Sequence, residues 1–286
     1  MSRNLKGGTA MLTYEFMRIA FLAAILLGIA IPLVGSTAVF KRLSSSGDAM
    51  AHASLAGVAI GLAAGLAPLA VSIISCIIAF LIIELLRKKF SKFSEIGVTV
   101  VLAASVAIAG IVSSYTSSYS FESYLFGSIL LISDAELYVC IGLAAVCLIF
   151  SVVFYRQIFA LLYSESEAKV AGVKVNLLNF LMDLLLAITI AVGAKIVGSM
   201  VVSCLMVLPT AIALQLKKGY LFTMVSSVIF SVASMAIGLT IAYYADWRPG
   251  ASIVMVALCF LFLCMLYRGL LYLLKRRRSQ DKQKAE

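Results

Sequence analysis

The sequence is poor in ionisable side chains. Only 13% of its 286 residues are charged, and His52 is its single histidine. Soluble domains carry about 25% charged residues. By contrast, 63% of the residues here are hydrophobic and the mean hydropathy is +1.10. This composition excludes an ordinary soluble domain and indicates a membrane protein with many spans.

Motifs that carry chemistry are also missing. The chain has no GxxxxGK[ST] phosphate-binding loop, no HExxH and no GxSxG elbow. Its six cysteines lie in apolar runs without a CxxC pattern, so they are expected to be small buried residues rather than zinc ligands or disulfides. We therefore expect a chain that is not an enzyme and has no cofactor of its own. Any ATP would be bound and hydrolysed by a separate subunit.

The net charge of +10 does not indicate a nucleic-acid partner. The basic residues form short clusters between apolar runs, which is typical of cytoplasmic loops of a protein embedded in a lipid bilayer. These clusters lie at 41–42, 87–92, 156–174, 217–218 and 275–286. They place all of these segments, including the basic tail at 275–286, on the cytoplasmic side.

The apolar runs predict an all-α polytopic membrane protein with about nine transmembrane helices, eight being the alternative. We expect one transmembrane domain over residues 1–286, multi-pass in a bacterial inner or plasma membrane, with residues 1–15 outside. The polar, aromatic stretch 114–128 predicts an interfacial loop with a short helix. The expected spans are about 16–40, 49–67, 68–86, 96–114, 137–155, 177–192, 196–214, 221–244 and 251–274.

The stretch Ser44–Gly57, SSSGDAMAHASLAG, carries the most informative pair, Asp48 and His52. Residues four apart share one face of a helix, so a carboxylate and an imidazole at this spacing can both reach one small cation. Ionisable groups are expensive in a membrane and mark functional sites. The structural alternative is that Asp48 caps the helix start after the serine run and that His52 only hydrogen-bonds to it.

The run that follows Asp48 is rich in alanine, glycine and serine up to Gly65. Small residues allow membrane helices to approach closely. We therefore expect this helix to be central, with the face of Asp48 and His52 turned toward protein or a transport pathway. Met50, two residues from each, should point away from that face.

Residues 156–175 form an amphipathic segment between spans, with Glu165 and Glu167 among its charges and Gly172 where a helix would end. The functional interpretation is a docking helix for a soluble partner. The structural alternative is a solvated surface helix.

Two further positions are candidate pathway residues. Asp183 lies deep in an apolar run, where a polar bond between helices is the structural alternative. Pro209 predicts a bent or broken helix, and broken helices line many substrate pathways. Lys195 lies in a short turn and is expected to reach the membrane surface with its ammonium group.

Several of these segments together resemble a known family. GDAMAHASLAGVAIG at 47–61 resembles the GDxxxHAxLxG signature of permease subunits of ABC importers for zinc, manganese and iron. KIVGSMVVSCLMVLPTAIA at 195–213 resembles the second signature of that family. SESEAKVAGV at 164–173 is similar to its cytoplasmic coupling segment, and DWRPGASIV at 246–254 to its last extracellular turn. The matches follow the family's order over nearly the whole chain.

The resemblance implies the ABC importer permease fold and a homodimer of this chain. It further implies two copies of a cytoplasmic ATP-binding subunit and an extracytoplasmic metal-binding protein that delivers the ion. Asp48 and His52 would meet the metal, and Glu165, Glu167, Ala168 and Gly172 would belong to the coupling segment. The continuation HASLAG is more similar to zinc members, so Zn²⁺ is the expected cargo, with Mn²⁺ or iron as the alternative.

A different class also fits the ionisable residues. In a secondary transporter driven by an ion gradient, Asp48, His52 and Asp183 would form a proton relay. Such a carrier needs no docking segment at 156–175, so that segment distinguishes the two classes.

Overall fold

The computed structural model describes residues 14–89, 94–115, 127 and 132–283, and these residues form helices without strands. The helices are α1 (Glu15–Phe40), α2 (Ser44–Ala64), α3 (Pro68–Lys89), α4 (Ser94–Ser113), α6 (Asp134–Val153), α7 (Tyr155–Tyr163), α8 (Glu165–Val170), α9 (Val175–Ile196), α10 (Ser199–Gln215), α11 (Tyr220–Ala245) and α12 (Pro249–Gln283). The all-α prediction is confirmed.

Eight of the described helices are long and apolar enough to cross a membrane. Of the nine expected spans, the one at 196–214 corresponds to α10, which is shorter than the other eight. It has 17 residues and is about 26 Å long, slightly less than the hydrocarbon core of a bilayer. α12 continues through 275–283, so most of the predicted basic tail is helical. The interfacial loop predicted at 114–128 lies almost wholly outside the described residues.

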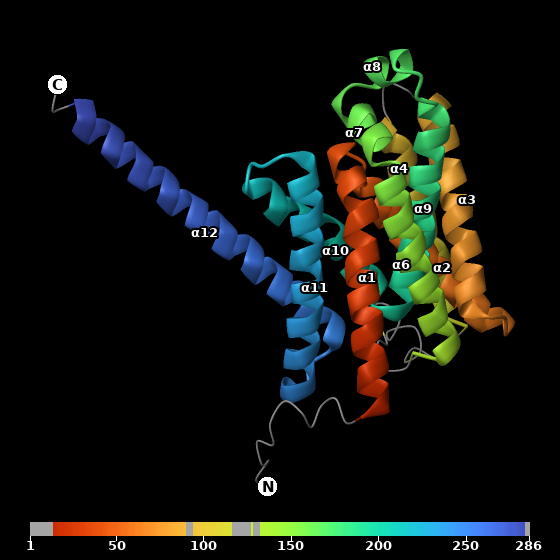
Figure 1. Cartoon of the computed structure of the whole chain (residues 1–286). Coiled ribbons are helices and arrows are strands. Elements are labelled where there is room, and N and C mark those ends of the chain that lie inside the picture. Colours follow the sequence, from red (N-terminus) through yellow and green to blue (C-terminus); the bar gives the residue numbers. More distant parts are fainter. Residues whose placement is uncertain (1–13, 90–93, 116–126, 128–131, 284–286) are drawn as a thin grey trace, which may run out of the picture.

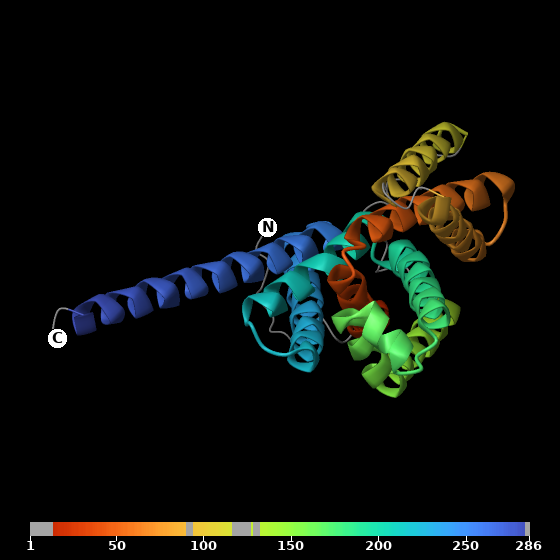
Figure 2. The same cartoon turned by 90° about the horizontal axis from the view of Figure 1, so that it is seen from above.

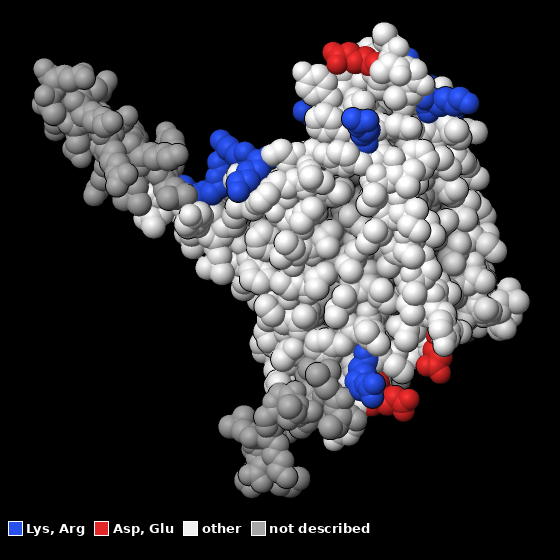
Figure 3. Space-filling model, in the orientation of Figure 1, with Lys and Arg blue, Asp and Glu red and all other residues white. Residues whose placement is uncertain are grey.

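Charged side chains are confined to the two ends of the bundle on the face shown in Figure 3. Figure 1 shows α7 and α8 together at one end, the same end at which α1 finishes and α9 begins. On the face in Figure 3, charged side chains gather at the two ends, and the broad band between them is uncharged. This pattern is that of a multi-pass protein of the cell membrane.

α2 is one of the three most buried of the eight candidate spans, together with α1 and α9. It packs against α3, α4, α9 and α10, and the view from above shows it between α4 on one side and α9 on the other (Figure 2). Its backbone comes very close to α3, since a Cβ atom added at Gly57 would lie 2.8 Å from the Cα of Ser72. The small residues of α2 therefore let other helices pack closely around it, as the sequence predicts.

Side-chain hydrogen bonds hold α2 against α3. Ser75 donates to the carbonyl of Ala53 at 2.8 Å, and the hydroxyls of Ser54 and Ser72 are 2.8 Å apart. Such bonds between membrane helices contribute roughly 0.6 kcal/mol each. They set the rotation of α2 about its axis, which decides where its ionisable side chains point.

Two ion pairs connect distant helices. Lys41, just after α1, lies 3.7 Å from Asp183 on α9, and the two side chains are 15% and 13% exposed. Burial lowers the pKa of Lys41, and the negative charge of Asp183 opposes this shift. Lys195, at the end of α9, pairs with Glu136 in the first turn of α6. The expectation that Lys195 reaches the surface is wrong, because its ammonium group is satisfied by a carboxylate inside the protein.

The close approach of α2 and α3 gives a stability prediction. Gly57→Ala should lower the unfolding temperature of the detergent-solubilised protein, because the added methyl group must displace the backbone of α3. Overpacking of this kind costs roughly 1–3 kcal/mol. Gly110→Ala on α4 is the matched control, because a Cβ atom there meets nothing within 4 Å. Equal unfolding temperatures for the two variants would contradict the packing described.

Candidate functional site

The start of α2 decides what Asp48 does. α2 begins at Ser44, and its N-cap residue Leu43 makes no side-chain capping bond. Asp48 is therefore the fifth residue of the helix, beyond the first-turn amides that a capping carboxylate would accept from. A helix-capping role for Asp48 is therefore excluded.

Asp48 and His52 face one another along α2. The Oδ1 of Asp48 lies 4.0 Å from the Nε2 of His52, and the side chains are 49% and 25% exposed. Two ligands of one ion at about 2.1 Å each would lie about 3.0 Å apart at a right angle and about 3.4 Å apart in a tetrahedron. A closure of less than about 1 Å would let both groups hold one cation.

A third polar group reaches this pair from α10. The hydroxyl of Ser203 donates to Oδ1 of Asp48 at 3.0 Å, across 155 residues of sequence. It also lies within reach of a second acceptor, the carbonyl of Ser199 at 3.3 Å. Ser203 lies inside the stretch 195–213, but no local pattern in the sequence distinguishes it from other serines in spans.

Glycines allow α10 to approach the site so closely. A Cβ atom at Gly47 would lie 2.6 Å from the sulfur of Met206, and one at Gly35 would lie 3.0 Å from the backbone of the same residue. α10 runs unbroken through Pro209, so of the two expected outcomes, a bent or a broken helix, the broken one is wrong. The chain turns instead between α9 and α10, where Gly198 has a φ of 106°.

Asp183 lies on the other side of α2. Together with Ser46, Met50 and Glu84 it lines a small cavity between α2, α3 and α9. Ser46 and Met50 are two residues from Asp48 in either direction, so they occupy a different face of α2. Met50 is buried, as its spacing predicts. The nearest charged partner of Asp183 is Lys41, not the pair on α2.

Among the described residues, no group of three or more histidine, cysteine, aspartate or glutamate side chains could hold a metal ion. Structural zinc sites have four protein ligands. A carboxylate and an imidazole alone make a weaker site, and weak binding suits an ion that must leave again.

The segment 156–175 is two helices rather than one. α7 ends at Tyr163, and the extended backbone of Ser164 separates it from α8. The Ser164 hydroxyl accepts a hydrogen bond from the backbone N–H of Glu167 and so caps α8. On the surface of α8, Glu165 pairs with Lys169 at 3.1 Å, whereas Ala168 is fully buried.

Gly172 ends α8 in the predicted way. Its φ is 82°, the left-handed conformation that glycine adopts without steric cost. The backbone N–H of Val173 donates to the carbonyl of Ala168, and that of Gly172 donates to the carbonyl of Lys169. These two bonds form a Schellman motif. Val173 and Lys174 then lead directly into α9.

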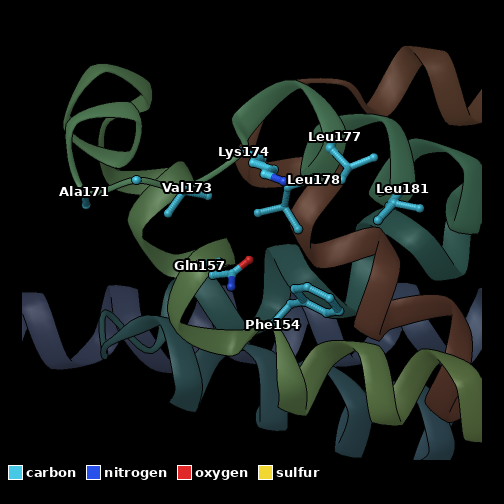
Figure 4. Close-up of a pocket in the computed structure, with 9 residues that line it drawn as sticks. Phe154, Gln157, Ala171, Val173, Lys174, Leu177, Leu178 and Leu181 are labelled. Carbon is cyan, nitrogen blue, oxygen red and sulfur yellow. The ribbon is translucent and has the colours of Figure 1, made fainter.

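An open groove lies beside this turn. It has a volume of about 450 Å³ and is bordered by α7, the Gly172 turn and the first turns of α9. Figure 4 shows Phe154 and Gln157 on one side and Leu177, Leu178 and Leu181 on the other, with Lys174 at the rim. Leucine, valine and phenylalanine side chains make up most of its walls, and it lies at the α7–α8 end of the bundle.

Comparisons with known proteins agree with this architecture. A relative from Treponema pallidum, described as a probable metal transport system membrane protein, is 37% identical over 88% of this chain and 96% of its own length. A probable iron transport system membrane protein of Haemophilus influenzae is 30% identical over 90% of this chain and 95% of its own length. The manganese transport system membrane protein MntC of Halalkalibacterium halodurans is 27% identical over 86% of this chain and 85% of its own length.

The fold matches a solved structure, and the sequence matches one family. The structure titled PsaBC from Streptococcus pneumoniae in complex with Fab superimposes with a TM-score of 0.80 at 25% identity, over 90% of this chain and 93% of that chain. The profile of the ABC 3 transport family matches residues 13–268. This chain, a metal-transport permease with an ionisable pair on an inner helix, therefore belongs to the ABC 3 transport family.

Proposed function

We propose that the chain is the permease subunit of an ATP-driven importer of a divalent transition metal. The observation that carries this proposal is the Asp48–His52 pair, because a carboxylate and an imidazole are costly on an apolar membrane helix and are suited to a passing cation. Asp183 and Pro209 stay candidate pathway residues.

A separate cytoplasmic ATP-binding subunit supplies the energy in this proposal. The chain lacks a phosphate-binding loop of its own. The groove beside Gly172 offers an apolar recess at the end of the bundle that we assign to the cytoplasm, and Glu165 and Glu167 are exposed in the first turn of the neighbouring helix α8. Two copies of the ATP-binding subunit would dock there, one on each permease.

The permease itself would be a homodimer that receives metal from an extracytoplasmic binding protein. α12 packs against α10 and α11 near its start and then diverges from the bundle (Figure 1). Its exposed apolar side chains, Phe262, Leu263 and Leu266 among them, are available to a second copy or to lipid. Two copies would bring two Asp48–His52 pairs to one pathway.

Two observations bear on the identity of the metal, and they favour different ions. The similarity of the HASLAG stretch to zinc members favours Zn²⁺, for which imidazole is a good ligand. The names of two relatives favour manganese and iron. Zn²⁺ is the first candidate cargo, and Mn²⁺ is the second.

The site prediction concerns Asp48→Asn and His52→Ala. Each variant should insert and co-purify with the ATP-binding subunit normally but lose at least about tenfold of metal uptake, because each removes one of two ligands. Uptake into proteoliposomes measures this. Asp134→Asn, at the exposed start of α6, is the control and should transport normally. Normal uptake by the Asp48 and His52 variants would refute the metal-path assignment.

The coupling prediction concerns Gly172→Val. Valine does not tolerate the positive φ of this position, so the turn between α8 and α9 should distort, at a cost of roughly 1–2 kcal/mol. Co-purification of the ATP-binding subunit should fall. Gly219→Val is the control, since Gly219 lies in another cytoplasmic turn with an ordinary φ of −60°. Equal co-purification of both variants would count against a coupling role for this turn.

The cargo prediction uses proteoliposomes that contain the chain and its ATP-binding subunit, with the binding protein outside. Zinc uptake should require ATP and resist excess Mn²⁺. If Mn²⁺ abolishes zinc uptake and is itself transported, the importer class holds and the cargo is manganese. Uptake driven by a proton gradient without ATP would instead support the secondary transporter.

A further inference from the structure

We propose that the hydroxyl oxygen of Ser203 is a third protein ligand of the transported ion, supplied by α10. The inference rests on the proposed function and deepens it. It assigns a residue outside the ionisable pair, and it makes the site a junction between two helices rather than a feature of α2 alone.

The hydroxyl of Ser203 has one proton and two acceptors within reach. In the structure described, the proton is directed to Oδ1 of Asp48 at 3.0 Å or to the carbonyl of Ser199 at 3.3 Å. In the first arrangement, the hydroxyl supplies one of the hydrogen bonds that the Asp48 carboxylate can accept. The second is the back-bond to the preceding turn that helical serines make. The two arrangements differ only by rotation of the hydroxyl proton.

Rotation of this proton converts Ser203 from a donor into a ligand. A cation beside Asp48 repels the proton, which then turns to the Ser199 carbonyl. A lone pair of Oγ is thereby presented to the cation. The backbone of α10 does not have to move for this exchange, because the second acceptor belongs to the same helix.

The distances fit an ion bound at this point. The separation of 3.0 Å between Oγ of Ser203 and Oδ1 of Asp48 equals that of two adjacent ligands at a right angle, each about 2.1 Å from one ion. Oδ1 is also the carboxylate oxygen nearest His52. Ser203 and His52 thus approach the same carboxylate oxygen, one at 3.0 Å and the other at 4.0 Å, so a hydroxyl oxygen, a carboxylate oxygen and an imidazole nitrogen are available beside it.

This donor set bears on selectivity. Carboxylate and hydroxyl oxygens are hard ligands, which favour ions such as Mn²⁺, and imidazole accepts most first-row divalent ions. Thiolate ligands favour soft ions. Replacement of the Ser203 oxygen by sulfur should thus change which ion is preferred, an effect that loss of helix packing would not produce.

The experiment measures equilibrium binding of Mn²⁺ and Cd²⁺ to the permease in complex with its ATP-binding subunit, in lipid nanodiscs, without the delivery protein. The variants are Ser203→Ala, Ser203→Thr and Ser203→Cys. Ser252→Ala is the matched control, since Ser252 makes the same back-bond to residue i−4, at 3.3 Å, on α12.

We expect Ser203→Ala to weaken Mn²⁺ binding by roughly tenfold or more, and Ser203→Thr to retain most of it because the hydroxyl is kept. Ser203→Cys should lower the preference for Mn²⁺ over Cd²⁺ by at least about tenfold and add a sulfur-to-cadmium charge-transfer absorption beyond that of the native cysteines. Ser252→Ala should bind as the native chain does.

Two results would overturn the proposal. One is unchanged Mn²⁺ affinity in Ser203→Ala while Asp48→Asn abolishes binding, which would leave the proposed site intact and remove Ser203 from it. The other is equal weakening in Ser203→Ala and Ser203→Cys, with no change in preference and no new absorption, which would reduce Ser203 to packing. Failure of the proposed function would give a different result, because Asp48→Asn and His52→Ala would then bind and transport the metal normally.

Discussion

The cost of placing an ionisable pair on an apolar membrane helix constrains the whole structure. A carboxylate and an imidazole cannot face lipid, so α2 has to be covered by protein along the length that carries them. Close covering requires small residues, and α2 supplies alanine, glycine and serine where α3, α4, α9 and α10 pack against it. The enclosure and the site are consequences of one sequence stretch, because the residues that permit close packing alternate with those that could meet the ion.

α2 is fixed differently on its two sides. Toward α3 it is held by direct hydrogen bonds, of which the bond from Ser75 to Ala53 is one. Toward α10 the contact consists of the Ser203–Asp48 bond and the packing of Met206 on Gly47. The first contact is purely structural, whereas the second includes a candidate ligand. A change in the position of α10 therefore alters the site without disturbing the packing of α2 on α3.

The sequence predicted the features that depend on local patterns. Apolar runs gave the spans, the small residues gave an enclosed α2, and the left-handed turn at Gly172 followed from its place at the end of an amphipathic segment. The misses were contacts between distant segments. Ser203 resembles any other serine in a span until α10 is placed against α2, and Lys195 has a buried partner, Glu136, only because α6 starts beside the end of α9. Pro209 is accommodated within an unbroken helix, an outcome set by neighbouring helices rather than by proline itself.

α9 connects the α7–α8 segment with the start of α10. Its first turns pack with α7 and α8 in one apolar cluster that includes Ile158, Ala168 and Leu178. Its other end, about 33 Å away, meets the tight turn at Gly198 from which α10 starts. α9 is therefore one continuous helix between the α7–α8 segment and the turn from which the helix of Ser203 starts. A displacement of α7 and α8 would be transmitted along this helix toward the neighbourhood of Asp48, without a break in secondary structure before Gly198.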